Sequence, residues 1–532
     1  MDEIKLSDDI FEQIKDFDYE YLTEEQESLI DKLITDEELN ERYRENGLCK
    51  LCKQPKTNFN YCWSCNSQHF QQNFKNWTSG NHVVDEFIQK AQLKAEWDNQ
   101  IIEWIEYDKF EDVEYLAKGG FGTTFKAVWK DGPWEFYYNY EQLERKGETK
   151  VALKCLHNSQ DITADFLKEV ESNILVYSYF TVRCFGITKD PKTNNFIMVM
   201  DLKKGSLRQH LNNNFISMNW REKLLNLYYI AFGLEVIHNK GLIHNDFHCG
   251  NMLSDFNEKA YITDLGLCQP ANVKSSQNTQ NSNKKIYGVL PYVAPEVLRG
   301  KEYTQQSDIY GFGIIAYEIC TGFPPYYDIA HDEYLAMKIC NGLRPKSNYK
   351  IPQLIFDIIN QCWDADPLKR PNANELQVLL LKLYFGIESN KVDSVIYGQV
   401  KEADEINKKS SIPIQLPLSS TSTLSYLTHP QAVYTSRILD FKNLPEPKNA
   451  DSNDDLIGIE YSEAASNVIS KLLEYYDKAD TSIYTISLVL DPSTQRRVSK
   501  SSKYGKGLFR NPRSKLNTKA LRAKKENTFK TP

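Results

Sequence analysis

The stretch HNDFHCGN, residues 244–251, decides how the rest of this 532-residue sequence is interpreted. It places Asp246 five residues before Asn251, and Asp264 follows Asn251 by thirteen residues. An aspartate can accept a proton from a hydroxyl group, and Mg²⁺ requires hard oxygen ligands such as carboxylates and amides. The spacing therefore predicts a site where a carboxylate base lies beside a bound magnesium ion.

A glycine-rich run, LAKGGFGTTFKAVW at residues 116–129, lies in a β-strand context upstream. Glycine has no Cβ, so backbone amides approach a phosphate closely. Such a run is weak evidence by itself because many loops contain one. The candidate nucleotide contacts in it are Ala117, Lys118, Gly119, Gly120, Phe121, Gly122 and Thr124.

Lys154 stands inside the apolar segment VALKCL, residues 151–156. A buried lysine is costly unless its charge is paired, so this one either reaches solvent at the end of a strand or binds phosphate. Its place downstream of the glycine-rich run favours phosphate. The expected partner is Glu169 in the segment DFLKEVESNIL. Glu171 is the alternative, and a solvated helix acid is the simpler interpretation of either residue.

Further segments follow in a fixed order, and the whole series resembles the eukaryotic protein kinases over residues 110–384. Each segment is a weak or moderate signal alone, but the ordered series is not expected by chance. The segments are DLGLCQP (264–270), PYVAPEVL (291–298), SDIYGFG (307–313) and CWDADPLKRP (362–371).

This resemblance implies an α+β, bilobal protein-kinase fold with ATP bound between the lobes. It implies that Lys154 contacts the α- and β-phosphates and is held by Glu169. It also implies that Asp246 is the catalytic base and that Asn251 and Asp264 bind Mg²⁺.

The same resemblance makes Met200 the gatekeeper and residues 201–203 the hinge that meets adenine. It implies that Glu296 pairs with Arg370 to brace the C-terminal lobe, and that Asp308 anchors the catalytic-loop backbone. The remaining nucleotide contacts that it implies are Ala152, Met200, Asp201, Lys203 and Leu253.

Several positions depart from the kinase pattern. Asn245 replaces an arginine that usually pairs with a phosphate on the activation segment, so we expect activity that depends little on phosphorylation there. His248 replaces a lysine and Val289 a threonine, and Tyr292 stands where tyrosine kinases have a tryptophan. These residues resemble the tyrosine-kinase-like group, which implies Ser/Thr specificity, with Tyr or dual specificity as the alternative. Ala117 replaces the first loop glycine.

Four cysteines form two Cys-x2-Cys pairs in CKLCKQPKTNFNYCWSC, at Cys49, Cys52, Cys62 and Cys65. This spacing predicts a structural zinc site closed by four thiolates. Four unrelated thiols and a redox pair are the alternatives.

The flanks carry two further resemblances. The cysteine knuckles, VVDEFIQKAQL (83–93) and HPQAVYTSRILDFKNLPEPKN (429–449) are similar to an expanded fungal family of tyrosine-kinase-like kinases. The stretch LLEYYDKADTSIYTISLVLDPS (472–493) is similar to a segment of hAT-type transposases. We interpret it as a remnant of a mobile element.

These patterns predict six regions along the chain. They are 1–46, an acidic helical segment with a short helix around residues 29–39; 47–80, the four-cysteine zinc knuckle; 81–109, an amphipathic linker helix packed on the next domain; 110–384, the kinase domain; 385–461, a Ser-, Thr- and Pro-containing linker with the family signature; and 462–532, the transposase-like fragment and a disordered basic tail.

The net charge of −8 is unevenly distributed: residues 1–46 carry 17 acids and 5 bases, and residues 496–532 carry 13 bases and one acid. We find no membrane span, and the acidic start lacks the plan of a signal peptide. We therefore expect a cytoplasmic location, with a nuclear one as the alternative, where the eleven cysteines are thiols or metal ligands.

The favoured hypothesis is a protein kinase that uses ATP and Mg²⁺, contains structural Zn²⁺ and acts on protein substrates. A pseudokinase scaffold without turnover is the alternative. A nucleic-acid-binding module is a third hypothesis, which only the basic tail keeps open.

Overall fold

The computed structural model describes residues 5–57, 62–119, 122–137, 142–156, 159–176, 179–255, 259–271, 286–388, 394–409 and 426–449. The chain divides into two units, Met1–Ser466 and Asn467–Pro532. The second unit lies outside the described residues, and so do the transposase-like stretch and the basic tail.

The helices are α1 (Asp8–Ile14), α2 (Glu24–Leu33), α3 (Glu37–Asn46), α4 (Trp63–Asn73), α5 (His82–Lys94), α6 (Ala164–Leu175), α7 (Leu207–Asn214), α8 (Trp220–Asn239), α9 (Pro295–Leu298), α10 (Gln305–Thr321), α11 (Glu333–Cys340), α12 (Gln353–Cys362), α13 (Ala373–Glu388) and α14 (Val395–Lys409). The strands are β1 (Glu103–Trp104), β2 (Phe110–Lys118), β3 (Gly122–Trp129), β4 (Trp134–Tyr137), β5 (Gln142–Arg145), β6 (Thr149–Leu156), β7 (Cys184–Lys189), β8 (Phe196–Asp201), β9 (Gly205–Ser206), β10 (Leu242–Ile243), β11 (Met252–Ser254), β12 (Ala260–Ile262), β13 (Gln269–Pro270), β14 (Ile286–Gly288) and β15 (Arg437–Leu439).

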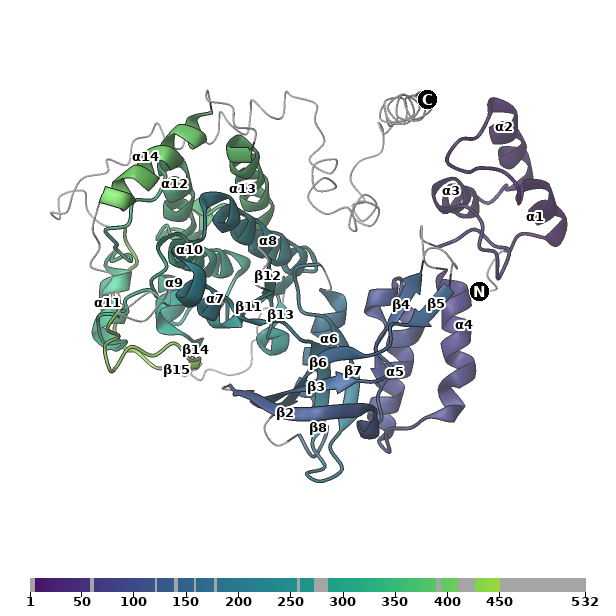
Figure 1. The fold of residues 1–532 in the computed structure, drawn as a ribbon, viewed down its shortest axis with the longest axis horizontal. Coiled ribbons are helices and arrows are strands. Elements are labelled where there is room, and N and C mark those ends of the chain that lie inside the picture. The colour runs from purple at the N-terminus through teal and green to yellow at the C-terminus, as the bar shows by residue number, and fades with distance from the viewer. Residues whose placement is uncertain are drawn as a thin grey trace, which may run out of the picture. The chain divides into compact units, whose positions relative to one another are not determined.

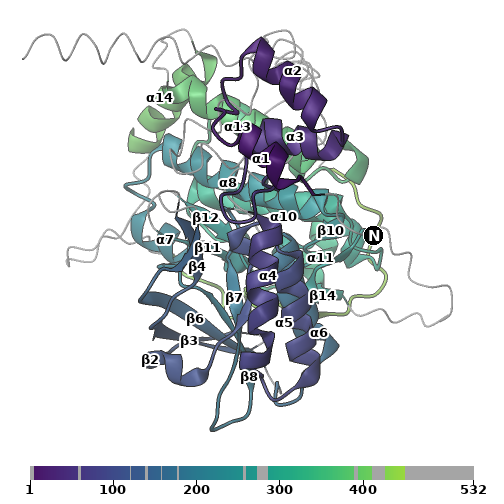
Figure 2. The ribbon, with the colours of Figure 1, turned by 90° about the vertical axis from the view of Figure 1, so that its right-hand side faces the viewer.

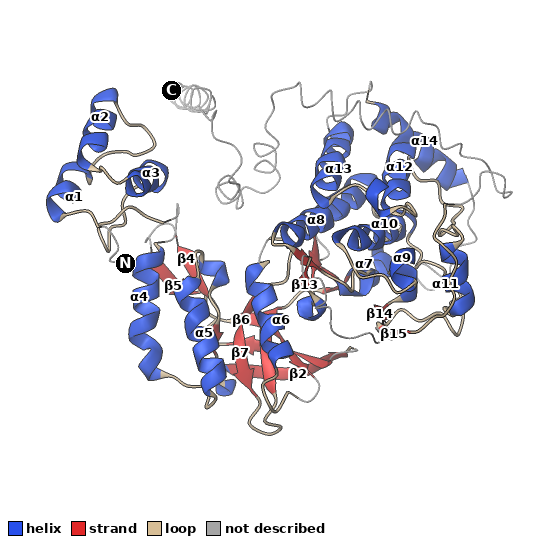
Figure 3. Cartoon of the chain, turned by 180° about the vertical axis from the view of Figure 1, so that it is seen from behind, coloured by secondary structure: helices blue, strands red, loops and turns tan. Residues whose placement is uncertain are grey.

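The kinase region begins with its longer strands and continues with most of its helices (Figure 3). Among the described residues, one sheet has the order β1-β7-β8-β6-β3-β2, and α6 follows β6 in the chain (Figure 1). The part from α7 to α14 is mainly helical, with only short strands. The predicted α+β class is therefore confirmed.

The alternation of strand β6 determines where Lys154 points. Val151 and Leu153 are fully buried in the cluster on one face of the sheet. Ala152 and Leu156 pack into the other cluster, which also contains Phe166 of α6. Because successive side chains of a strand alternate between faces, Lys154 lies on the α6 face. The sequence of β6 thus aims a lysine at the following helix.

The linker helix predicted within residues 81–109 is shorter than expected, because α5 ends at Lys94. The chain then extends into β1, which pairs in parallel with β7, Glu103 opposite Gly186. A Cβ at Gly186 would lie 2.0 Å from the carbonyl oxygen of Glu103, so glycine permits this close pairing. The β-branched pair Ile101-Ile102 favours extended backbone here, and tertiary pairing with β7 overrides the helical spacing of the apolar residues.

Helix α5 packs on the sheet and on α6. Its Val84 and Ile88 are fully buried in one cluster with Phe166 and Val170 of α6. Figure 2 shows α5 lying alongside α4. The folded unit around α6 therefore begins upstream of residue 110.

The acidic N-terminal segment forms more helices than the sequence suggested. The short helix expected around residues 29–39 is divided, because α2 ends at Leu33 and Asp36 caps α3 by accepting the backbone N–H of Leu39 at 2.9 Å. The buried side chains shared by α1, α2, α3 and the residues around them are Leu6, Ile14, Ile30, Ile34, Leu39 and Tyr43.

The expected linker over residues 385–461 contains ordered elements. Helix α14 buries Ile396, Val400 and Ala403, a spacing that places them on one helical face. The Trp220 indole donates to the Asp404 carboxylate at 2.9 Å, which attaches α14 to α8. Residues 395–409 of the expected linker are thus helical and packed on the kinase region.

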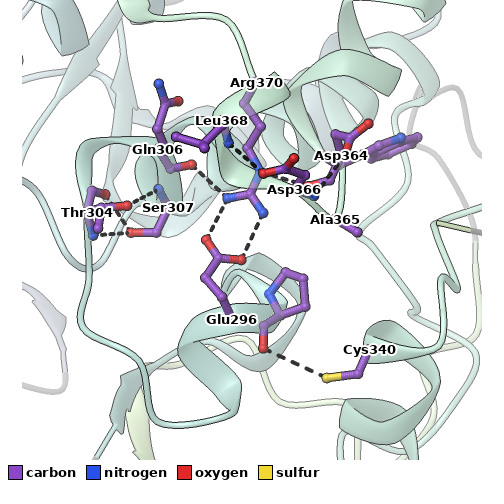
Figure 4. Close-up of polar contacts among 12 residues, drawn as sticks. Glu296, Thr304, Gln306, Ser307, Cys340, Asp364, Ala365, Asp366, Leu368 and Arg370 are labelled. Atoms are coloured by element: carbon purple, nitrogen blue, oxygen red, sulfur yellow. Dashed lines mark hydrogen bonds and ion pairs between the residues drawn. The ribbon is translucent and has the colours of Figure 1, made fainter. Parts of the chain in front are cut away.

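A buried ion pair braces the helical part (Figure 4). The Arg370 guanidinium contacts both carboxylate oxygens of Glu296, at 2.7 and 2.8 Å, and also donates to the carbonyl oxygen of Gln306 at 2.9 Å. The pair connects the start of α9 to the residues that precede α13. No helix in the described parts of the chain is long and apolar enough to cross a membrane.

Replacing Ile88 by alanine tests the packing of α5. We expect Ile88→Ala to lower the free energy of unfolding by about 3 kcal/mol, because it leaves a cavity beneath α6. Val83→Ala on the exposed side of the same helix is the control and should change it by less than about 0.5 kcal/mol. Urea unfolding of both variants measures the difference, and equal effects would contradict this packing.

Candidate active site

The loop at residues 244–251 is held by a buried carboxylate. Asp308, in the first turn of α10, accepts the backbone N–H groups of His244 at 2.8 Å and of Asn245 at 3.2 Å. It also contacts Nε2 of His238 at 2.9 Å. Asn245 adopts a left-handed φ of 68°, a conformation that asparagine tolerates better than most residues. Asp308 therefore fixes the loop that carries Asp246.

Lys154 bridges two carboxylates from different parts of the chain. Its Nζ lies 2.6 Å from Oε1 of Glu169 on α6 and 3.0 Å from Oδ1 of Asp264, just after β12. Burial alone would lower the pKa of Lys154, but the charges of Asp264 and Glu169 outweigh burial and raise it. The lysine is thus held as a cation. The expected partner Glu169, rather than the exposed Glu171, occupies this position.

A glycine allows Glu169 to reach the lysine. A Cβ at Gly266 would lie 2.6 Å from Oε2 of Glu169, so any other residue would push the carboxylate away. Burial raises the pKa of Glu169, and the neighbouring Lys154 opposes that shift. Asp264 itself has a left-handed φ of 63°, which turns its carboxylate towards the lysine.

Asp246 and Asn251 lie together as their spacing suggested. The Asn251 amide group donates to the carbonyl oxygen of Asp246 at 2.9 Å and faces its Oδ2 at 3.4 Å. Since the NH₂ side faces Asp246, the amide oxygen is directed elsewhere and is free to act as a hard ligand. Burial pushes the pKa of Asp246 upward, but the nearby His248 and the hydrogen bond from Ser436 outweigh it and lower the pKa.

His248, which stands where the kinase pattern has a lysine, is buried beside Asp246. Nδ1 of His248 accepts the backbone N–H of Gly250 at 3.0 Å, and Nε2 lies 3.5 Å from Oδ2 of Asp246. Among the described residues, Oδ1 of Asp246 accepts no hydrogen bond. A small cavity beside it is lined by Val289 and Tyr303. The apolar Val289 side chain leaves that oxygen without a donor.

Asn245 contacts the start of the segment that follows Asp264. Its amide donates to the carbonyl oxygen of Leu267 at 2.6 Å and accepts from the Gln269 side chain at 3.2 Å. These are contacts between uncharged groups, so the arginine and the phosphate of the usual pattern have no part in them. No local spacing in the sequence predicts that Asn245 contacts Leu267 and Gln269.

The nucleotide-side residues are described in part. Ala117 pairs with Thr124 and Lys118 with Thr123 across β2 and β3. The N–H of Gly119 donates to the carbonyl oxygen of Gly122 at 2.9 Å, while Gly120 and Phe121 lie outside the described residues.

The residues expected at the hinge lie at the end of β8. Met200 is buried and pairs with Ala152 of β6. Asp201 contacts Lys203, whose Nζ is 2.7 Å from the Asp201 carboxylate and 3.6 Å from the centre of the Tyr261 ring. Leu253 of β11 packs against the same apolar cluster as Met200.

One residue at this site escaped sequence reasoning. The Ser436 hydroxyl donates to Oδ2 of Asp246 at 2.6 Å and lies 3.1 Å from Nε2 of His248. It is 190 residues from Asp246 along the chain, so no local spacing pointed to it.

The four cysteines gather as one group. The Sγ atoms of Cys49 and Cys65 are 3.6 Å apart, and those of Cys52 and Cys62 are 3.5 Å apart. All four Sγ atoms lie within 4.8 Å of one another. Tetrahedral zinc with bonds of about 2.3 Å requires sulfur separations of roughly 3.8 Å. The donor set therefore fits a zinc ion.

Residues 110–380, about half of the chain, match the family of protein tyrosine and serine/threonine kinases. The chain belongs to this protein kinase family.

Three curated proteins show how this kinase chain relates to known proteins. One is a putative serine/threonine-protein kinase/receptor of Acanthamoeba polyphaga mimivirus, 28% identical over 298 residues that cover 54% of this chain and 17% of the relative. The probable serine/threonine-protein kinase roco5 of Dictyostelium discoideum is 30% identical over 296 residues, covering 52% of this chain and 10% of the relative. A protein kinase and PP2C-like domain-containing protein of Arabidopsis thaliana is 30% identical over 222 residues, covering 36% and 34%. The matched segment thus spans no more than about a third of each of these relatives.

The contacts of Asn245 are tested by hydrogen exchange. Asn245→Ala removes both bonds to the segment after Asp264, at about 1 kcal/mol each, so amides of residues 265–271 should exchange at least roughly tenfold faster. Asn239→Ala, at the exposed end of α8, is the matched control and should leave them unchanged. Equal exchange in both variants would show that Asn245 does not hold this segment.

Proposed function

We propose that this chain is an active protein kinase that transfers the γ-phosphate of ATP to serine or threonine hydroxyls of protein substrates. The observation that carries the proposal is the placement of Lys154 between Glu169 and Asp264. A lysine paired in this way is oriented and permanently charged, as a phosphate ligand must be. The retained aspartate and asparagine at positions 246 and 251 support turnover rather than a pseudokinase scaffold.

Each residue has a defined part in this proposal. Asp246 orients the acceptor hydroxyl and receives its proton, which its lowered pKa allows because the carboxylate stays ionised. Lys154 holds the α- and β-phosphates, and Glu169 holds the lysine. Bound Mg²⁺ would neutralise phosphate charge, with Asn251 and Asp264 as its ligands.

We further propose membership of the tyrosine-kinase-like group, with Ser/Thr specificity. The pairing of His248 with Val289 supports this, and so does the fit of the short Ser436 side chain beside Asp246. The uncharged contacts of Asn245 support activity that depends little on phosphorylation of the activation segment.

A reducing location, cytoplasmic or nuclear, fits the free state of all eleven cysteines, every one of which lies in the described part of the chain. Three further features stay predictions. They are the similarity to the fungal family, the origin of the transposase-like fragment, and contact of the basic tail with nucleic acid.

Phosphate transfer tests the kinase proposal. Asp246→Asn removes the proposed base and should lower the rate of transfer from labelled ATP to casein by about 10²–10⁴-fold. Transfer should also need Mg²⁺. Asp161→Asn, at an exposed surface position, is the matched control and should retain the wild-type rate. Wild-type protein that binds ATP but transfers no phosphate would make the chain a pseudokinase.

We also propose that the four-cysteine cluster binds a structural zinc ion, since four thiolates leave no position for a substrate. Elemental analysis of the purified chain should find one zinc per molecule. Cys49→Ser and Cys62→Ser should lose the metal, whereas Cys155→Ser, outside the cluster, should keep it. Metal retained in both cluster variants would contradict the assignment.

A further inference from the structure

Residues 426–449, here called the C-terminal strap, bring a hydroxyl group of this chain to its own catalytic aspartate. The strap contacts the kinase region at several places between α7 and α12. At its centre the Ser436 Oγ lies 2.6 Å from Oδ2 of Asp246. That is hydrogen-bond distance, and it is the distance at which a general base takes a proton from its substrate.

The second contact of Ser436 fixes the direction of its hydroxyl hydrogen. Because Nδ1 of His248 accepts the N–H of Gly250, its hydrogen is on Nε2. Nε2 therefore donates to the Ser436 oxygen over 3.1 Å. The serine hydrogen is then directed to Asp246, which is an acceptor only. One lone pair of the serine oxygen stays available for attack on phosphorus.

The strap binds as an added β-strand. Strand β15, directly after Ser436, pairs antiparallel with β14, with Arg437 opposite Gly288 and Leu439 opposite Ile286. Leu439 is buried. Strand addition with a buried anchor side chain is a common way for proteins to bind an extended peptide. The strap therefore lies against β14 as a peptide substrate would.

Anchors on both sides of Ser436 keep it in this register. The N–H of Val433 donates to Nδ1 of His331 at 3.1 Å, and the Tyr434 hydroxyl donates to the carbonyl oxygen of Pro325 at 2.9 Å. Downstream, Arg299 contacts both carboxylate oxygens of Glu446. Because the strap is tethered to the site it occupies, its local concentration far exceeds that of a free peptide.

The neighbouring hydroxyls do not share this position. Tyr434 commits its hydroxyl to Pro325, and Thr435 is exposed. The Ser436 hydroxyl, by contrast, contacts Oδ2 of Asp246, so the site holds Ser436 and not its exposed neighbour.

We propose that Ser436 is an intramolecular phosphorylation site of this kinase, and the proposal rests on the kinase activity proposed above. The Ser436 oxygen forms a bond to the γ-phosphorus of ATP while the bond from that phosphorus to the bridging oxygen breaks. The serine proton passes to Asp246, and ADP leaves with the bridging oxygen. The products are phosphoserine at position 436 and ADP.

The test uses the full chain with Mg²⁺ and labelled ATP, with casein present in a parallel reaction. Mass spectrometry should locate the phosphate on Ser436. Its rate constant should stay unchanged, to within about twofold, over a hundredfold dilution, because the reaction is unimolecular. Ser436→Ala should lose this label, and Thr435→Ala, the matched control next to it, should keep it.

A mixing experiment separates reaction within one chain from reaction between chains. Lys154→Met cannot hold the phosphates but keeps Ser436 and Asp246. A tagged Lys154→Met chain mixed with wild type should stay unlabelled at Ser436. Labelling of that chain as fast as wild type would overturn the intramolecular assignment.

The remaining outcomes are distinguishable. Transfer to casein without phosphate on Ser436 would overturn this inference and leave the kinase proposal intact. Transfer to neither would overturn the kinase proposal and the inference with it. Phosphate on Ser436 alone supports both, since the strap then excludes the external substrate.

Discussion

The charge of Lys154 is the constraint around which the kinase region is arranged. A buried cation has to be paired, and its two partners come from α6 and from the loop that follows β12. Nζ of Lys154 therefore connects the sheet to α6 and to the loop that carries Asp264. Removing one carboxylate would leave the lysine with a single ionic partner, whereas removing the lysine would leave two buried carboxylates without their cation. In the proposed function this pairing keeps Lys154 charged as a phosphate ligand.

The unusual residues of the catalytic loop replace charge by uncharged hydrogen bonding. Asn245 contacts backbone and amide groups in place of a phosphate, and His248 donates to a hydroxyl in place of a lysine contact. In the described part of the chain no group donates to Oδ1 of Asp246, and Val289 lines the cavity beside it. Asp246, Asn251 and Asp264 are retained beside these changes. The loop therefore keeps its shape through Asp308 rather than through a modification elsewhere in the chain.

Both flanks of the kinase region are structural parts of it. Upstream, α5 and β1 contribute to the cluster beneath α6 and to the edge of the sheet, so they stabilise the helix that carries Glu169. Downstream, α14 covers helical surface near α8, and the C-terminal strap reaches Asp246. The position of α6 and the contact made at Asp246 thus depend on segments outside the matched kinase region.

The sequence by itself determined the chemistry: the spacing of Asp246, Asn251 and Asp264, the lysine of β6 and the four cysteines identified the family and the candidate ligands. These features are readable because they depend on local spacing and on residue types with few other uses. Only the tertiary structure decided that residues 95–105 leave the helix for β1, and that Ser436 meets Asp246. Both depend on pairing between segments far apart in the chain, where burial and strand hydrogen bonds outweigh local periodicity, and a single sequence carries no record of that pairing.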